Sequence, residues 1–283
     1  MSEPLHNLIV VSDLHCGCQF GLCPADVRIQ LDSGAQYVPS GNQQSVWVWW
    51  RYFWDQWVPS VTRGEDYGIV INGDIVDGDH HKNKTHISGN FAIQAEIARS
   101  CIQPELDKPN CKALYMIRGT ECHVGQSGEN EEQLARSLCA IPDGIGNHSR
   151  HDMYMLLGGD DGCLINFNHH IGTTGSTHYE STAVMKELAE AYSECGRWGD
   201  RKPDIIVRSH RHRSIKIEVP TDNGYGIAFT TPGWQLKTPL VHRIPGGRNS
   251  TPQFGGFLIR QGDEEHYTRS KIWSIRRTPT TAA

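Results

Sequence analysis

Aspartate and histidine residues recur at short spacing in four segments of the chain, each directly after an apolar run. Asp13 and His15 follow the run 8–11, and Asp74 follows the run 69–71. Carboxylate oxygens suit hard divalent cations, and imidazole nitrogens suit zinc, manganese and iron. These residue types therefore predict a metal site where the strands end. The other members of the set are His169 and His170 after the run 163–165, and His210 and His212 after the run 205–207.

The residue types in these segments are also compatible with a pair of metal ions. A carboxylate such as Asp74 can bind two ions at once. Two ions about 3.5–4 Å apart can activate a water on one side of a phosphorus atom and hold the phosphoryl oxygens. Alternation along an extended segment turns Asp13 and His15 to the same side, and His210 and His212 likewise. A centre of this kind could therefore catalyse hydrolysis at phosphorus.

The order of the segments resembles the calcineurin-like metallophosphoesterase superfamily. That family has D-x-H, then G-D-x-x-D, G-N-H-[DE], a single His and G-H-x-H. This chain reads D-L-H at 13–15, G-D-I-V-D at 73–77 and H-R-H at 210–212, and the resemblance spans about residues 5–215. It implies a first ion on Asp13, His15, Asp74 and His212, and a second on Asp74, Glu121, His169 or His170, and His210.

The third motif departs from the family pattern, because the chain reads R-G-T-E-C-H at 118–123. The family asparagine, which binds the second ion, is absent. Glu121 could supply the missing oxygen, and His123 could be the proton donor to the leaving group, displaced by one position. The alternative is a weakened second site, or one completed by water. Arg118 could clamp a phosphate or pair with a carboxylate of the site.

Two further positions in the motifs leave alternatives open. His169 and His170 are adjacent and point to opposite faces if their strand continues. Alternation from Phe167 favours His169, whereas the family's His-Gly shape could equally select His170. Both therefore remain candidate ligands. Asp77 matches the family's second aspartate, for which we expect a role in orienting a ligand or a loop. Ser209 stands where the family has glycine, a minor departure.

Alternating strand and helix patterns run to about residue 210, and strands alone follow from 214. This order favours an α/β class with two mixed sheets flanked by helices, which matches the family's four-layer α/β/β/α sandwich. We expect one domain over 1–275 and a flexible tail over 276–283. The expected strands are 7–12, 67–72, 112–118, 153–158, 163–169, 204–209, 214–219, 225–231, 255–262 and 266–275, and the expected helices 43–58, 89–106, 129–139 and 181–195.

The stretch between the first two motifs is long, and we read about 16–60 as an insertion. Asp13 and Asp74 are 61 residues apart, whereas the family resemblance implies about 25–30, in line with the short connections of such folds. Tryptophans at 47, 50, 54 and 57 share one helical face, which favours a core helix over a base-stacking platform. The Gly-rich part, 16–42, is a candidate lid over the site or a contact in a homodimer.

Composition restricts where the protein acts. No stretch approaches about 18–20 apolar residues, so we expect no membrane span. The start lacks the basic and apolar regions of a secretory signal. Cys16, Cys18 and Cys23 cluster but form no C-x2-C pair, and the other six cysteines are scattered. This favours reduced thiols over a structural zinc, and so the cytoplasm, or a host's cytoplasm if a phage encodes the chain. The G-T-E-x-H variant is similar to calcineurin-like proteins predicted in phages and prophages.

The expected activity is hydrolysis of phosphomonoesters or phosphodiesters with two divalent ions, Mn²⁺ foremost and Zn²⁺, Fe²⁺, Ni²⁺ or Mg²⁺ as alternatives. The substrate could be a nucleotide or DNA. A net charge of −5 argues against a surface that coats nucleic acid. A basic segment over 197–216 would nevertheless fit a DNA nuclease of the double-strand-break repair type. A scaffold protein that binds metal but has lost catalysis is the alternative from another class.

Overall fold

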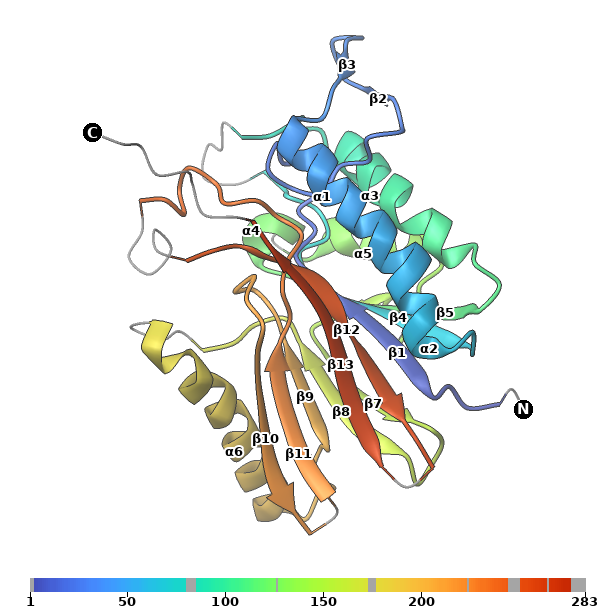
Figure 1. The fold of residues 1–283 in the computed structure, drawn as a ribbon, viewed down its shortest axis with the longest axis vertical. Coiled ribbons are helices and arrows are strands. Elements are labelled where there is room, and N and C mark those ends of the chain that lie inside the picture. The colour runs from blue at the N-terminus through green and yellow to red at the C-terminus, as the bar shows by residue number, and fades with distance from the viewer. Residues whose placement is uncertain are drawn as a thin grey trace.

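Two mixed β-sheets stacked face to face form the centre of the computed structural model (Figure 1). It describes residues 3–79, 85–125, 127–172, 177–222, 224–243, 250–263 and 265–275, so the expected tail at 276–283 lies outside them. The six-stranded sheet has the order β13-β12-β1-β4-β5-β6, and the five-stranded sheet the order β10-β11-β9-β8-β7. A two-stranded sheet, β2-β3, stands apart.

The strands are β1 (Asn7–Val11), β2 (Ile29–Gln30), β3 (Gln36–Tyr37), β4 (Tyr67–Asn72), β5 (Cys111–Ile117), β6 (Ser149–Arg150), β7 (Asp152–Leu157), β8 (Cys163–Asn168), β9 (Ile205–Arg208), β10 (Ile215–Thr221), β11 (Gly224–Thr230), β12 (Gln253–Gln261) and β13 (His266–Ser274). The helices are α1 (Gly41–Tyr52), η1 (Phe53–Trp57), α2 (Val58–Thr62), α3 (Phe91–Leu106), α4 (Glu121–Val124), α5 (Glu129–Ser137), η2 (Thr177–Tyr179) and α6 (Glu180–Trp198).

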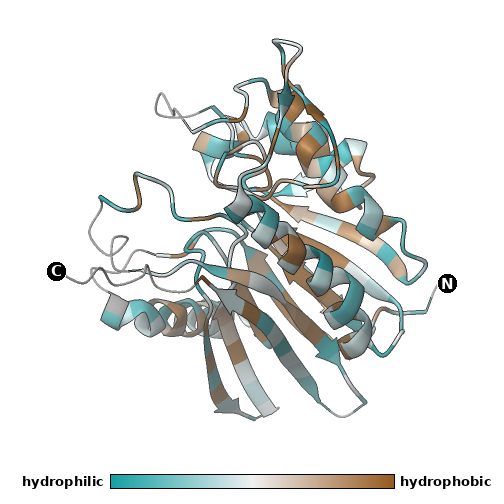
Figure 2. Ribbon diagram, turned by 45° about the horizontal axis from the view of Figure 1, so that its top comes forward, coloured by the Kyte–Doolittle hydropathy of each residue, from teal (hydrophilic) through white to brown (hydrophobic). Residues whose placement is uncertain are grey.

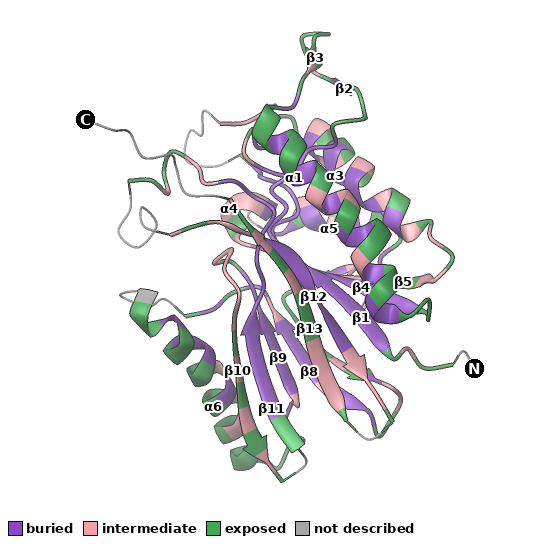
Figure 3. Ribbon diagram, viewed as in Figure 1, coloured by how far each residue is buried: buried purple, intermediate pink, exposed green. Residues whose placement is uncertain are grey.

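Three apolar interiors separate four layers. Between the sheets, Val10 of β1 packs with Phe167 and Phe229 of the other sheet. A second interior lies between the six-stranded sheet and the helices α1 and α3, and a third between the five-stranded sheet and α6. The predicted α/β/β/α sandwich is therefore confirmed. In Figures 2 and 3 the inner strands carry many apolar residues and are largely buried, whereas α1 and α6 carry polar, exposed residues as well as buried ones.

Parallel pairing brings the ends of several strands to one edge. β1, β4 and β5 are neighbours and run parallel, as do β8 and β9 in the other sheet. All residues of β1, β4 and β9 are buried, as expected for strands covered on both faces. The loops that leave these strands carry the predicted ligands, so the stacking of the sheets brings the four segments together.

The tryptophan-rich segment is a core helix, as predicted. Ser40 and Gln43 form a capping box at the start of α1, and the helix continues through the π-helical η1 into α2. The rings of Trp50 and Trp54 are fully buried, which excludes a base-stacking role for them. The buried amide of Gln43 also donates to the carbonyls of Cys18 and Gly21, so that α1 holds part of the 16–42 stretch.

The cysteines and the helices bear on the expected environment of the protein. All nine cysteines are free. Among the helices of the described residues, none is both long and apolar enough to cross a membrane.

Candidate metal centre

Five of the predicted ligands have a left-handed backbone. Within the described residues, only Arg63 and Cys139 share a positive φ among the non-glycine positions. This conformation is strained for most residues and is concentrated at functional sites. The prediction that strand alternation aims these side chains is wrong, because they lie beyond the ends of the strands and the left-handed turns aim them instead. The five angles are 53° at Asp13, 46° at His15, 52° at Asp74, 69° at His210 and 52° at His212.

Close packing of the loops requires glycine at two motif positions. A Cβ added to Gly73 would lie 2.3 Å from His169 Nδ1, and one added to Gly119 would lie 2.0 Å from Asp74 Oδ1. Both distances are far inside van der Waals contact. The backbone N–H of Asp13 also donates to the Gly73 carbonyl at 3.0 Å, which joins the first two loops. The glycines before Asp74 and Thr120 therefore let the loops converge.

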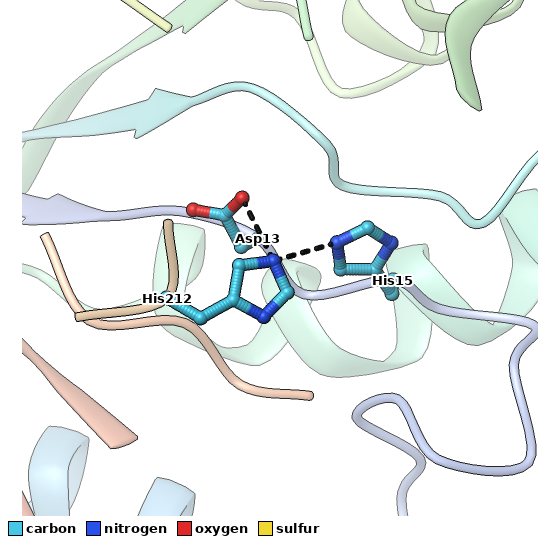
Figure 4. Close-up of side chains that lie close together, drawn as sticks. All are labelled: Asp13, His15 and His212. Atoms are coloured by element: carbon cyan, nitrogen blue, oxygen red, sulfur yellow. Dashed lines mark hydrogen bonds and ion pairs between the residues drawn. The ribbon is translucent and has the colours of Figure 1, made fainter. Parts of the chain in front are cut away.

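The first cluster consists of Asp13, His15 and His212 (Figure 4). His212 Nε2 lies 3.2 Å from Asp13 Oδ1 and 3.2 Å from His15 Nε2. Asp13 Oδ1 is buried and makes no hydrogen bond within the described residues. Two ligands of one ion, each about 2.0–2.2 Å from it, lie about 3.0–3.5 Å apart. The spacing and the orphaned oxygen therefore fit a bound cation.

The second cluster consists of Asp74, His169 and His210. His169 Nε2 lies 3.1 Å from Asp74 Oδ2, and its Nδ1 contacts the carbonyl of Asn72 at 2.7 Å. A carbonyl only accepts, so Nδ1 carries the proton and Nε2 faces the carboxylate, as in many metal-binding histidines. The neighbouring His170 is exposed and belongs to none of the clusters that the described residues form. The geometry therefore favours His169 over His170 as a ligand.

A third cluster joins His15 and Asp74 to His123. His123 Nε2 lies 4.0 Å from Asp74 Oδ2, and its ring meets that of His15 edge to face, with 4.6 Å between centroids. His123 Nδ1 contacts the carbonyl of Asp77 at 2.6 Å. The candidate proton donor thus points into the same crevice as the candidate ligands.

Glu121 and Arg118, the other predicted residues of the third motif, belong to none of the three clusters of described residues. Glu121 begins α4 and is exposed. Arg118 donates to Ser149 Oγ and to the Ser127 carbonyl, both at 3.1 Å, and lies 3.8 Å from Glu132. These contacts of Arg118 anchor the end of β5.

Burial and charge oppose each other in the centre. Burial disfavours the charged form of Asp13, but His212 and His169 outweigh it and lower the pKa of Asp13 to about 2. Burial would likewise lower the pKa of His169, but Asp74 and then Asp13 raise it to about 10. The pKa of Asp74 is also held well below its usual value, against burial, by His169 above all. Buried carboxylates of this kind need nearby positive charge, which a divalent cation would also provide.

Residues outside the predicted set hold the loops in place. The fully buried Glu131 accepts the N–H of Ile75 at 3.0 Å through Oε1 and the N–H of Gly119 at 2.8 Å through Oε2. It therefore ties the second motif to the third. Burial, with the charge of Asp74, raises the pKa of Glu131 to about 7. The sequence gives no signal for this role, since acidic residues in the first turn of a helix are common at surfaces.

Asp77 lies beside the first cluster, in keeping with the orienting role expected from the sequence. Its Oδ1 is 3.4 Å from His15 Nδ1, and its Oδ2 is 3.5 Å from Nε2 of His86, which the sequence did not single out. Ser209 bonds through its hydroxyl to Asn72 at 2.6 Å and to Thr231 at 2.7 Å. The serine therefore contributes a buried polar link between the two sheets that glycine could not make.

Three solved structures show distant likenesses to the chain. No family model matches the chain, and no curated protein matches it. Among solved structures, the vacuolar protein sorting 29 of Cryptosporidium parvum aligns over 96% of this chain and 100% of its own, with 12% identity and a TM-score of 0.33. The Thermotoga maritima protein TM1076 gives the same two coverages, 9% identity and a TM-score of 0.33.

The sulfate thiohydrolase SoxB of Thermus thermophilus, in complex with glycerol, aligns over 97% of this chain and 57% of its own, with 10% identity and a TM-score of 0.40. All three scores are below 0.5, so these likenesses carry no inference about activity. The functional argument rests on the clusters themselves.

Proposed function

We propose that the chain is a metallophosphoesterase that hydrolyses phosphomonoesters or phosphodiesters with two divalent ions, Mn²⁺ foremost. One observation carries the proposal: Asp74 Oδ2 lies 3.1 Å from His169 Nε2 and 4.0 Å from His15 Nε2. A carboxylate between two histidine-containing clusters suits the bridging ligand of a dinuclear site. Two ions held there would supply Lewis-acid charge and an activated water for attack at phosphorus.

The chain's own residues would hold and orient these ions. Asp13, His15 and His212 would hold the first ion, while His169 and His210 would hold the second, with Asp74 common to both. Hydrogen bonds from the Nδ1 positions to backbone carbonyls fix the His169 and His123 rings. Left-handed backbone at five of these positions leaves little freedom for the side chains to reorient, so the ligands are preorganised.

The nuclease alternative gains no separate observation in the basic segment. The basic segment at 197–216 was expected to grip DNA, but six of its seven cations pair with a nearby acid and Arg211 donates to the Gly172 carbonyl. Exposed ion pairs of this kind are weak, so they neither exclude nor favour phosphate-backbone binding. The pairs are Arg197–Glu194, Arg201–Asp204, Lys202–Asp222, Arg208–Glu187, Arg213–Glu180 and Lys216–Glu218.

A substrate panel tests the proposal. The protein, loaded with Mn²⁺ and separately with Zn²⁺ or Mg²⁺, is assayed on nitrophenyl phosphate, bis-nitrophenyl phosphate, nucleotides, and linear and single-stranded DNA. Turnover that disappears with chelator and in Asp74→Asn supports the phosphoesterase. Two bound ions without turnover on any of these would favour the scaffold protein, and turnover on DNA alone would favour the nuclease.

Free cysteines throughout are consistent with action in a reducing compartment such as the cytoplasm.

A further inference from the structure

We propose that His123 is a ligand of the first ion. The altered third motif would then leave the second ion without the family's asparagine ligand and supply the first ion with an additional imidazole. This rests on the proposed dinuclear centre. The family resemblance assigned His123 to protonation of the leaving group and the missing ligand to the second ion. The geometry points to a different distribution.

The distances around His123 fit coordination. His123 Nε2 and His15 Nε2 each lie 4.0 Å from Asp74 Oδ2, and the three atoms lie within 4.8 Å of one another. A point equidistant from three such atoms is about 2.1–2.5 Å from each, which matches metal–nitrogen and metal–oxygen bonds. The spacing of these three atoms therefore suits a single metal ion between them.

The hydrogen bond at the other ring nitrogen sets the ring for metal binding. The Asp77 carbonyl can only accept, so Nδ1 of His123 carries the proton at 2.6 Å. The neutral ring then presents the Nε2 lone pair toward Asp74 and His15. His169 shows the same arrangement, with Nδ1 on the Asn72 carbonyl and Nε2 toward Asp74. A carbonyl–histidine pair of this kind is typical of metal ligands.

The backbone around His123 is fixed as well. Its N–H donates to the Thr120 carbonyl at 2.8 Å within the single turn of α4. The loop after β4 packs closely on it, because a Cβ added to Gly78 would lie 2.4 Å from the His123 carbonyl oxygen. Gly78 has a φ of +70°, which favours glycine. The position of His123 thus depends on a turn and a close contact that both require specific residues.

A shared nitrogen assigns His123 to the first ion. His15 Nε2 lies 3.2 Å from His212 Nε2 and 4.0 Å from Asp74 Oδ2, and His15 belongs to both clusters. One imidazole nitrogen has one lone pair and binds one ion, so His123 would share its ion with His15. The donor atoms of the two clusters do not form one group within 4.8 Å, so side chains of the two clusters would move toward the ion as it binds, and the first ion would then take its ligands from Asp13, His15, Asp74, His123 and His212.

The second ion would be held more weakly. Its ligands would be Asp74, His169 and His210. The Thr120 hydroxyl, which lies 3.1 Å from His210 Nδ1, stands in place of the amide oxygen that binds the second ion in the family. Imidazole-rich sites favour zinc, iron or nickel over magnesium. We therefore expect a first ion that survives dialysis and a second that exchanges readily.

Metal binding measured apart from turnover tests the assignment. Wild type, His123→Ala, His123→Asn and the control His170→Ala are titrated with Zn²⁺ and with Co²⁺ by calorimetry and visible absorption. The expected result is that His123→Ala weakens the tighter ion at least about 10–100-fold and alters the cobalt spectrum at one equivalent, as a lost imidazole should. The control should retain both affinities and the spectrum. Circular dichroism of the metal-free proteins checks folding, and His123→Asn serves if His123→Ala does not fold.

The outcomes separate this inference from the proposed function. Wild type that binds no ions overturns both. Wild type with two ions, together with His123 variants that keep the tight affinity and the cobalt spectrum, overturns the His123 assignment alone. Loss of the weaker ion instead of the tighter one in those variants also overturns it. Loss of the tighter ion alone supports it.

Discussion

Thr120 donates two hydrogen bonds to Asp74, one from its backbone N–H to Oδ1 at 2.7 Å and one from its hydroxyl to Oδ2 at 3.3 Å. The same hydroxyl lies 3.1 Å from His210 Nδ1. The third motif therefore orients the carboxylate that we propose to bridge the two ions, although its sequence departs from the family pattern. Variants of these two residues give the most direct tests of the centre.

Asp74→Asn should lower kcat by about 10³-fold or more, because both ions lose a charged ligand. The amide keeps the volume of the side chain, and Asp74 lies in a loop beyond β4, so the fold should survive. Turnover, metal content by elemental analysis and thermal unfolding without metal are measured together. Near-normal turnover with unchanged metal content would rule out the assigned bridge.

Glu121 and Thr120 should differ in their effects on the second ion. The sequence suggested Glu121 as the replacement ligand, but this side chain is exposed and outside the clusters, whereas Thr120 contacts both Asp74 and His210. Thr120→Ala should lower the affinity for the second ion about 10-fold, which is the lower end of the effect expected when a group that orients a metal ligand is lost. Glu121→Ala should bind both ions like wild type, and Thr120→Asn should tighten the second.

The measurement is the metal content of each variant after dialysis against graded chelator. One retained ion in Glu121→Ala under conditions where Thr120→Ala retains two would reverse the assignment and restore Glu121 as the ligand.

At a pH above 7, where the carboxyl is ionised, Glu131→Gln should destabilise the fold by about 1–3 kcal/mol, because an amide oxygen can accept only one of the two buried N–H bonds and its NH₂ group faces a donor. Urea unfolding in chelator measures this effect apart from metal binding. The exposed Glu96→Gln on α3 is the matched control, for which a change within about 0.5 kcal/mol is expected. A wild-type unfolding midpoint in Glu131→Gln would show that the carboxylate does not tie the second and third motifs.

The strands could be predicted from the sequence because they are short apolar runs between polar turns. β4 lies at its predicted bounds, and β1 and β8 each end one residue earlier than predicted. Buried parallel strands need such runs, whatever the loops do. The helices α3 and α5 were also expected, since their lengths allow a recognisable pattern.

The finer geometry of the centre could not be predicted. The single turn of α4 depends on the loop after β4 packing against it, a contact that lies far away in sequence. The left-handed backbone of Asp13 and His212 has no signal in residue type, because these are not glycines. The choice between His169 and His170 depended on which ring could reach the Asn72 carbonyl, and Glu131 looked like surface charge.

Glu132 should make the fold sensitive to acid. Its carboxylate accepts the N–H groups of His148 at 3.0 Å and Ser149 at 2.8 Å, as well as that of Arg136 Nε at 2.8 Å. It also lies 3.8 Å from Arg118, at the end of β5 before the third motif. Burial alone would raise the pKa of Glu132, but these hydrogen bonds lower it to about 2.

The sign follows from proton linkage. The pKa of Glu132 is lower in the folded chain than in the unfolded chain, where the ordinary value is 4.5, so the unfolded chain binds more protons between these values. The contribution to stability is complete above about pH 4.5 and is lost as the pH falls toward 2. Glu132→Gln should therefore be less stable than wild type at pH 7, with a difference that shrinks on acidification. Urea unfolding at several pH values, with the exposed Glu190→Gln as control, measures it, and a difference independent of pH would contradict the assignment.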